Sequence, residues 1–297
     1  MILEEKKWNR LGIIGYGSHI DAKKSPSAVQ RVRLFRKYGM RCIIVPQHFK
    51  GKQKRLFDRE LALYLCGFAI DNGAYTCHLH KTEFPEERFL ELCNLFGNGA
   101  DWIAIPDVVA DGKKTLDILP IWLDKIKKHT SNTNLLLVWQ DGMTLEDITP
   151  FLKQGIGVFI GGTTEGKLKN MYWICKICKK YKVLCHVGRV NTYKRIKLCK
   201  NAGAISFDGS GWSRFICTMM HLEKIITERQ LSLFKQNLDK DIIQTWIKTP
   251  KQREKVLLPN EKQAHKYLLD IAKINCNGVG LPKGSNKQQY PILYRTT

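Results

Sequence analysis

The sequence predicts an α/β fold, a (β/α)8 barrel of the TIM type followed by a helical, basic C-terminal extension. Eight short runs rich in Ile, Val and Leu recur along the chain, and none alternates between polar and apolar residues. Such runs are typical of parallel strands buried on both faces. Stretches with helical spacing separate them, and eight such units in about 220 residues fit a closed barrel. A doubly wound parallel sheet is the alternative.

The elements are expected in the following order. The strands are predicted at Leu11–Gly15, Cys42–Val45, Phe68–Ile70, Trp102–Ile105, Leu135–Trp139, Gly157–Ile160, Val183–Cys185 and Ala204–Phe207. Helical spacing is found at Pro85–Phe96, Lys113–Lys128, Leu145–Lys153, Leu168–Lys180 and Tyr193–Asn201. After Ser213 the pattern is helical and increasingly basic. We therefore predict a catalytic barrel over residues 1–227 and an extension over residues 228–297.

The charge of the chain points to a polyanionic partner. The 297 residues include 49 Lys and Arg against 27 Asp and Glu, a net charge of +22. The charge is uneven, because residues 151–200 hold 12 basic side chains and 1 acidic one, whereas residues 51–150 hold 11 and 15. A basic surface of this kind is typical of nucleic-acid binding, and a merely solvated Lys-rich surface is the alternative.

Other features of the sequence suggest a cytoplasmic protein. No stretch approaches about 20 uninterrupted apolar residues, and the charged N-terminal residues do not resemble a secretory signal. We therefore expect no membrane association. The 10 cysteines form no regular disulfide framework, so we expect reduced thiols.

Polar residues cluster where the predicted strands end, which is where barrel enzymes carry their chemistry. Singly, each has a structural explanation, since Asp, Asn and Gly form turns and Asp caps helices. Together they predict a shared active site at one mouth of the barrel. The residues are Asp71, Asp107, Gln140, Gly161, Gly162, His186 and Asp208.

Paired carboxyl groups at such a site suit glycosyl transfer. One carboxylate can attack an anomeric carbon and hold it covalently, while a second carboxyl group moves the proton of the leaving group. Amide and backbone groups such as those of Gln140 and Gly162 can read the edge of a planar base. An aromatic ring such as that of Tyr75 can stack on its face.

Four segments, in order along the chain, resemble motifs of the tRNA-guanine transglycosylases. The Asp-Ser-Gly-Gly-aromatic and Val-Gln-Gly-Gly motifs of that family are similar to Asp71-Asn72-Gly73-Ala74-Tyr75 and Trp139-Gln140-Asp141-Gly142. Its Gly-Gly-Leu-x-x-Gly-Glu motif resembles Gly161-Gly162-Thr163-Thr164-Glu165-Gly166-Lys167. Its Phe-Asp-x-x-x-Pro-Thr-Arg motif resembles Phe207-Asp208-Gly209-Ser210-Gly211-Trp212-Ser213-Arg214. The family exchanges guanine in a polynucleotide for a 7-deazaguanine on a barrel of this type.

The resemblance implies a role for each matching residue. Asp208 would be the nucleophile on C1′ of the target nucleotide, and Asp71 the general acid and base. Tyr75 would stack on the base, and His186 or its neighbour Val187 would lie on the opposite face. Arg214 would bind phosphate or orient Asp208. The base itself would be held by Asp107, Gln140, Gly161 and Gly162. No cofactor is implied.

The zinc site of the tRNA-modifying members has no counterpart here, because Cys217 and Cys276 are the only cysteines after Asp208. The chain therefore resembles most closely the members without zinc that insert 7-deazaguanines into DNA. Three alternatives stay open: the same exchange on tRNA, a non-catalytic nucleic-acid-binding partner subunit, and a glycosidase. Whether the chain forms a homodimer or requires an accessory protein is also open.

Two further groups of residues suggest metal or substrate binding less strongly. Cys175 and Cys178 have the spacing of zinc ligands, but an amphipathic helix around them indicates core thiols. His78 and His80 have the spacing of a strand and are expected in a surface hairpin rather than in the site. We predict no metal.

Overall fold

The computed structural model describes residues 11–18, 31, 34, 35, 37–48, 67–215, 218, 219 and 222–226. Of these, residues 11–18, 35, 37–48 and 67–215 belong to one compact unit and the others to a second. The first unit holds every element named below. The predicted extension, residues 228–297, lies outside the described residues.

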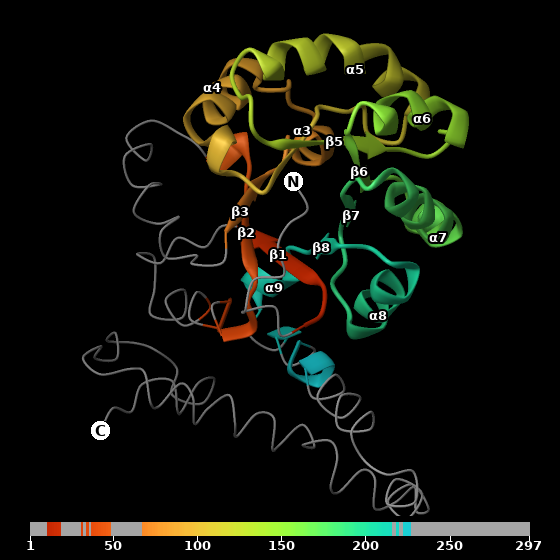
Figure 1. The fold of residues 1–297 in the computed structure, drawn as a ribbon. Coiled ribbons are helices and arrows are strands. Elements are labelled where there is room, and N and C mark those ends of the chain that lie inside the picture. Colours follow the sequence, from red (N-terminus) through yellow and green to blue (C-terminus); the bar gives the residue numbers. More distant parts are fainter. Residues whose placement is uncertain are drawn as a thin grey trace, which may run out of the picture. The chain divides into compact units, whose positions relative to one another are not determined.

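Eight parallel strands close into a barrel, in which each strand pairs with the next along the chain and β8 pairs with β1 (Figure 1). This topology confirms the predicted (β/α)8 fold, and it is not that of an open doubly wound sheet. The register of the closure sets Ile14 beside Ser206 and Tyr16 beside Asp208. The strands are β1 (Ile14–Ser18), β2 (Arg41–Ile44), β3 (Phe68–Ile70), β4 (Trp102–Ala104), β5 (Asn134–Trp139), β6 (Gly157–Ile160), β7 (Cys185–Val187) and β8 (Ser206–Asp208).

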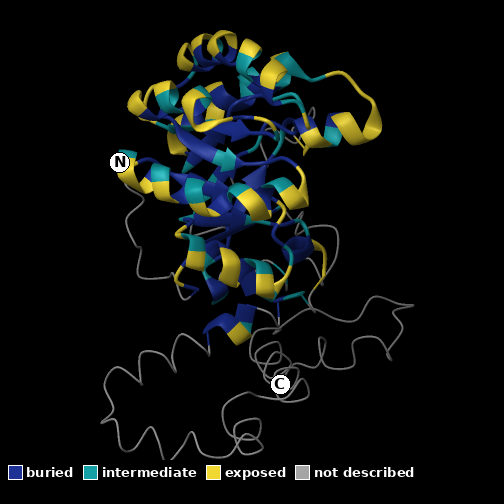
Figure 2. Ribbon diagram, turned by 90° about the vertical axis from the view of Figure 1, so that its right-hand side faces the viewer, coloured by how far each residue is buried: buried dark blue, intermediate teal, exposed yellow. Residues whose placement is uncertain are grey.

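Helices connect the strands on the outside of the barrel and expose their outer faces, while the strands are buried (Figure 2). The described α-helices are α3 (Ala74–His80), α4 (Glu86–Phe96), α5 (Gly112–Lys127), α6 (Leu145–Lys153), α7 (Thr164–Tyr181), α8 (Tyr193–Ala202) and α9 (Gly211–Arg214). Short 3-10 turns lie at η1 (Pro46–His48) and η3 (Gly97–Gly99). None of the described helices is both long and apolar enough to cross a membrane.

Polar side chains start the helices that follow the strands. Asp111 accepts a hydrogen bond from the backbone N–H of Lys114 at the start of α5, and Thr144 forms a capping box with Asp147 in α6. Thr163 and Thr192 cap α7 and α8 in the same way. These caps fix where each helix begins, and therefore where the preceding strand-end loop delivers its side chains.

Aromatic rings fill the interior of the barrel. The ring centroids of Trp102 and His186 lie 4.5 Å apart, and those of Phe159 and His186 lie 4.7 Å apart. Tyr16 packs edge-on against Trp102 at 5.3 Å. Ile14, Ala104 and other apolar side chains complete this core. The described interior of the barrel is therefore filled by side chains, and in barrels of this type a site lies at a mouth.

Two of the predicted elements differ from the structure. The seventh strand lies two residues later than expected, so His186 is inside β7 and its ring points into the barrel, while Cys185 points outward to Cys175 of α7. The expected hairpin around His78 and His80 is wrong, because these exposed residues belong to α3. Asn72 explains this helix, since its side-chain oxygen accepts from the N–H of Ala74 at 2.7 Å and opens the first turn.

Candidate active site

The carboxyl ends of the strands bring the predicted polar side chains to one mouth of the barrel. Asp71 follows β3, Gln140 follows β5, and Asp208 is the last residue of β8. Asp107 lies in the loop after β4. The carboxyl group of Asp71 is close enough to Asp208 and Asp107 for both charges to raise its pKa. Residues far apart in the sequence thus share one electrostatic environment.

Asp208 is held by two donors on the same oxygen. His186 Nε2 lies 3.0 Å from Asp208 Oδ1, and the backbone N–H of Arg189 donates to that oxygen at 3.2 Å. Burial lowers the pKa of His186, although Asp208 opposes this effect, and the shift favours the neutral ring. A neutral ring that donates from Nε2 accepts at Nδ1, where the hydroxyl of Ser206 lies at 2.8 Å. Among the described residues no donor reaches Oδ2.

Asp71 has a strongly perturbed carboxyl group. Burial, together with the nearby charge of Asp208, raises its pKa from 3.8 to about 7. Hydrogen bonds from the backbone, including that of Gly73 at 3.3 Å, oppose the shift. A carboxyl group with a pKa near neutrality can both release and accept a proton at physiological pH, which is the property of a general acid and base.

Asp107 is fixed by two amide side chains. Asn72 Nδ2 donates to one carboxylate oxygen at 2.9 Å, and Gln140 Nε2 donates to the other at 2.6 Å. Burial raises the pKa of Asp107 to about 6, and these two amides oppose the shift. Gln140 in turn accepts from the N–H groups of Ala110 and Gly162, each at 3.1 Å. The network leaves Asp107 with one orientation.

The two glycines after β6 are engaged within the protein. The N–H of Gly161 donates to the carbonyl of Trp139 at 3.0 Å, and the N–H of Gly162 donates to Gln140. Gly162 has a positive φ of 68°, which favours glycine. These glycines set the shape of the mouth, and their predicted contact with a base stays a prediction.

Arg189 joins the site although the motifs gave it no role. Its guanidinium donates to the carbonyl of Gly162 and lies 4.6 Å from the ring centroid of Tyr75, which is half exposed. Its φ is 58°, an uncommon backbone conformation that directs its N–H toward Asp208. The only sequence signal for Arg189 is a basic residue directly after a strand-end glycine. Asn72 belongs to the first of the four motifs, but the sequence gives no sign of its hydrogen bond to Asp107.

Arg214 is an exposed residue at the end of α9, six positions after Asp208. Its predicted contact with phosphate or with Asp208 stays a prediction. His186, predicted on the face of a bound base, lies instead below Asp208 and is fully buried. The shift of β7 explains this position.

The cysteines of α7, β7 and α8 form a buried cluster behind the mouth. Cys175 Sγ and Cys185 Sγ lie 3.5 Å apart, and burial raises the pKa of Cys199 to about 12. Every cysteine in the described part of the chain is buried and takes no part in a disulfide. Within the described ranges, no three His, Cys, Asp or Glu side chains are placed to hold a metal ion.

The sequence matches no protein-family model. It also matches no curated protein. The resemblance to the tRNA-guanine transglycosylases therefore depends on the four motifs, and the structure sets the acidic and amide residues of these motifs around one mouth.

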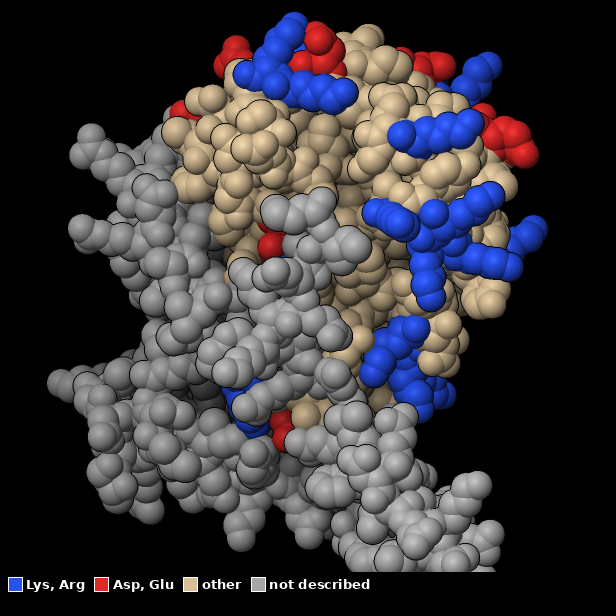
Figure 3. Space-filling model, viewed as in Figure 1, with Lys and Arg blue, Asp and Glu red and all other residues tan. Residues whose placement is uncertain are grey.

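The described surface over α7 and α8 is basic. Figure 3 shows Lys and Arg side chains gathered over α7 and α8, whereas acidic side chains mix with basic ones over α4 to α6. Glu165 is the only acidic residue between residues 151 and 200. The exposed lysines of the basic face are Lys169, Lys176, Lys179, Lys180, Lys182, Lys194 and Lys197.

Proposed function

We propose that this chain is a transglycosylase that exchanges guanine in DNA for a 7-deazaguanine base through a covalent intermediate on Asp208. The observation that carries the proposal is the pair of carboxyl groups at the mouth. Asp208 is oriented by two N–H donors on Oδ1, and Asp71, close by, has a pKa raised to about 7 by burial. Two neighbouring carboxyl groups in such different environments suit a nucleophile and a general acid.

In the first half of the reaction, Asp208 Oδ2 attacks C1′ of the target nucleotide. The bond between C1′ and the base nitrogen breaks, and Asp71 gives its proton to the departing guanine. The attacking oxygen is Oδ2 because Oδ1 already accepts from His186 and Arg189. The product is an ester-like bond between Asp208 and the sugar.

In the second half, the incoming 7-deazaguanine gives its ring N–H proton to Asp71 and attacks C1′. The bond to Asp208 breaks, so the carboxylate is regenerated and the configuration of the sugar is retained after two displacements. No oxidant, reductant or energy-rich co-substrate takes part.

Recognition of the base is assigned to Asp107 and Gln140, with Tyr75 as the stacking ring. Each carboxylate oxygen of Asp107 has a second lone pair, which can accept from the N–H groups on the edge of guanine. The target nucleotide must leave its stack before C1′ reaches Asp208, at a cost of a few kcal/mol. The net charge of +22 favours the approach of a polyanionic nucleic acid to the chain.

The test is incorporation of labelled guanine and labelled 7-cyano-7-deazaguanine into duplex DNA and into tRNA. The full chain is compared with Asp208→Asn and with Asp117→Asn, which makes the same change at an exposed residue of α5. Label in DNA that requires Asp208 and not Asp117 is the expected result. A covalent adduct of protein and DNA on a denaturing gel, absent in Asp208→Asn, identifies the intermediate.

Other outcomes assign the alternatives. Label in tRNA alone moves the same chemistry to the other substrate. Tight DNA binding without label in either nucleic acid overturns the proposal in favour of a non-catalytic partner subunit. Incorporation by Asp208→Asn at the wild-type rate overturns the assigned nucleophile.

A further inference from the structure

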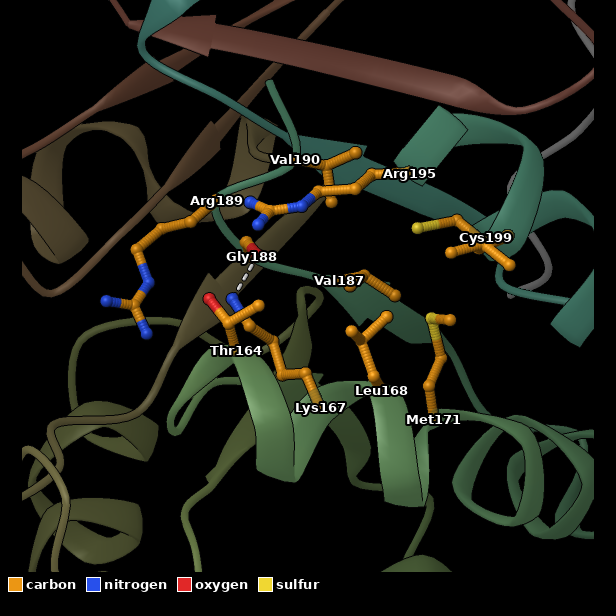
Figure 4. A pocket seen from close by; sticks show the side chains of 11 residues that line it. Thr164, Lys167, Leu168, Met171, Val187, Gly188, Arg189, Val190, Arg195 and Cys199 are labelled. Atoms are coloured by element: carbon orange, nitrogen blue, oxygen red, sulfur yellow. Dashed lines mark hydrogen bonds between the residues drawn. The ribbon is translucent and has the colours of Figure 1, made fainter. Parts of the chain in front are cut away.

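A second concave site lies beside the mouth, between α7 and α8 (Figure 4). Basic groups gather at one end of this pocket, and apolar side chains form the rest of its wall. No carboxylate lines it among the described residues. The residues that line the pocket include Lys167, Arg195, Thr164, Leu168, Met171 and Val187.

Lys167 brings an unusual buried charge to the pocket. Lys167 is only 7% exposed, and its Nζ donates a hydrogen bond to the carbonyl of Gly188 at 2.7 Å. Burial, together with the guanidinium groups of Arg189 and Arg195, lowers the pKa of Lys167 to about 8. Asp208 opposes that effect, but no carboxylate of the described residues lies within ion-pair distance of Lys167. A buried cation beside two other cations is costly unless an anion joins them.

Arg195 completes the basic end. Figure 4 shows its guanidinium extended across the pocket toward Gly188 and Lys167, while the side chain of Arg189 points away from the pocket. Arg195 lies in the first turn of α8 and has no ion-pair partner among the described residues. A guanidinium and an ammonium that face one space are the groups that bind phosphate oxygens best.

The pocket is connected to the nucleophile through one peptide group. The carbonyl of Gly188 accepts from Lys167, and the N–H of the same peptide, on Arg189, donates to Asp208 Oδ1. An anion in the pocket therefore lies on the far side of the loop that holds Asp208. The pocket is therefore separated from the carboxylate of Asp208 by a single peptide group.

We propose that the pocket between α7 and α8 binds a phosphodiester group of the nucleic acid, close to the target nucleotide. The inference rests on the proposed function. Lys167 and Arg195 contact the phosphate oxygens, and the apolar wall of Leu168, Met171 and Val187 packs against the adjoining sugar. The transglycosylase motif has Glu where this chain has Lys167. The positive charge is therefore a property of this chain and not of the motif.

The test compares Arg195→Gln with Lys194→Gln. Both variants remove one positive charge from the first turn of α8, but Lys194 is exposed and does not line the pocket. The affinity of the full chain for a labelled duplex of mixed sequence is measured by fluorescence anisotropy between about 50 and 200 mM salt. Thermal unfolding of each variant checks that it is folded.

Arg195→Gln should lower the slope of log affinity against log salt by about 0.9 and weaken binding roughly fivefold to tenfold at about 0.1 M salt. Lys194→Gln should change both values by less than half as much. Arg195→Lys keeps the charge and should restore the slope. Equal effects of Arg195→Gln and Lys194→Gln would overturn the proposal, because the charge would then act from anywhere on the surface.

Two further measurements separate the explanations. The first is the phosphorus NMR line of inorganic phosphate, which broadens when phosphate binds a protein. If wild type broadens this line and Arg195→Gln does not, while both proteins bind DNA with the same salt slope, the pocket takes a free anion and the proposal fails. If the slope changes as expected but wild type exchanges no base, the pocket stands and the proposed chemistry fails. Base exchange in wild type together with equal salt slopes refutes the pocket alone.

Discussion

Replacing Asp71 with Asn should stabilise the folded barrel at alkaline pH while it abolishes base exchange. The carboxyl group of Asp71 has a pKa raised to about 7, whereas in the unfolded chain it ionises at its ordinary value of 3.8. Between these values the folded chain holds a proton that the unfolded chain has lost. Its contribution to stability therefore falls as the pH rises through this window and is constant above the folded pKa. Asn cannot ionise, so it does not bear this cost.

The size of the effect follows from the same pKa. From pH 5 to the folded pKa of about 7 the window spans about two pH units, and each unit is worth about 1.4 kcal/mol. The free energy of unfolding that Asp71 costs between pH 5 and pH 8 is therefore at most about 2.7 kcal/mol. Water reaches part of the Asp71 side chain, which is not fully buried, and screening reduces this limit. We expect Asp71→Asn to gain about 1–2.5 kcal/mol more at pH 8 than at pH 5.

Urea unfolding of wild type, Asp71→Asn and Asp117→Asn at both pH values measures this difference. Asp117 is exposed on α5, so its replacement should change the free energy of unfolding equally at pH 5 and pH 8. Asn keeps an oxygen for the N–H of Gly73, so that hydrogen bond is not lost. An equal effect of Asp71→Asn at the two pH values would refute the reasoning, since the carboxyl group would then have no raised pKa.

Two other substitutions test the supporting contacts. His186→Phe keeps a ring among Trp102 and Phe159 but removes the donor to Asp208; a hydrogen bond to a charged group is worth about 1.5–3 kcal/mol, so the exchange rate should fall about 10-fold to 150-fold. DNA affinity should not change, and a matching loss of affinity would contradict a role in positioning Asp208. Gln140→Leu should lower the free energy of unfolding by about 2–4 kcal/mol, because the buried N–H of Gly162 loses its acceptor and the carboxylate of Asp107 loses a donor. Denaturant titration measures the free energy of unfolding. A loss below about 0.5 kcal/mol would show that other groups take over the hydrogen bonds of Gln140.

The sequence predicted the barrel well because its signals are local. Each buried strand is a short apolar run, and α5 to α8 each begin at a capping Asp or Thr, such as Thr163 or Thr192. The polar residues at the strand ends could be assigned to one mouth because parallel strands bring their carboxyl ends together. The prediction therefore required only the order of the elements and not their packing.

The details of the site depend on contacts between distant segments, which one sequence does not reveal. His186 was expected in a loop, but a shift of two residues in β7 turns its ring into the barrel beneath Asp208. Arg189 reaches Tyr75, more than 100 positions earlier in the chain, through a backbone conformation with positive φ. The raised pKa of Asp71 likewise arises from burial and from Asp208, neither of which its own neighbours in the sequence specify.

Under the proposed function, the aromatic filling of the barrel limits how the site could change its choice of base. Trp102, Phe159 and His186 occupy the space below the mouth, so a bulkier base cannot be accommodated by deepening the site. Removing one of these rings would open a cavity that costs about 3–5 kcal/mol and would also release the support of Asp208. Room for a larger group on the base must come from the loops after the strands. In this architecture, preference among related bases can diverge at the rim while the interior that orients the nucleophile stays fixed.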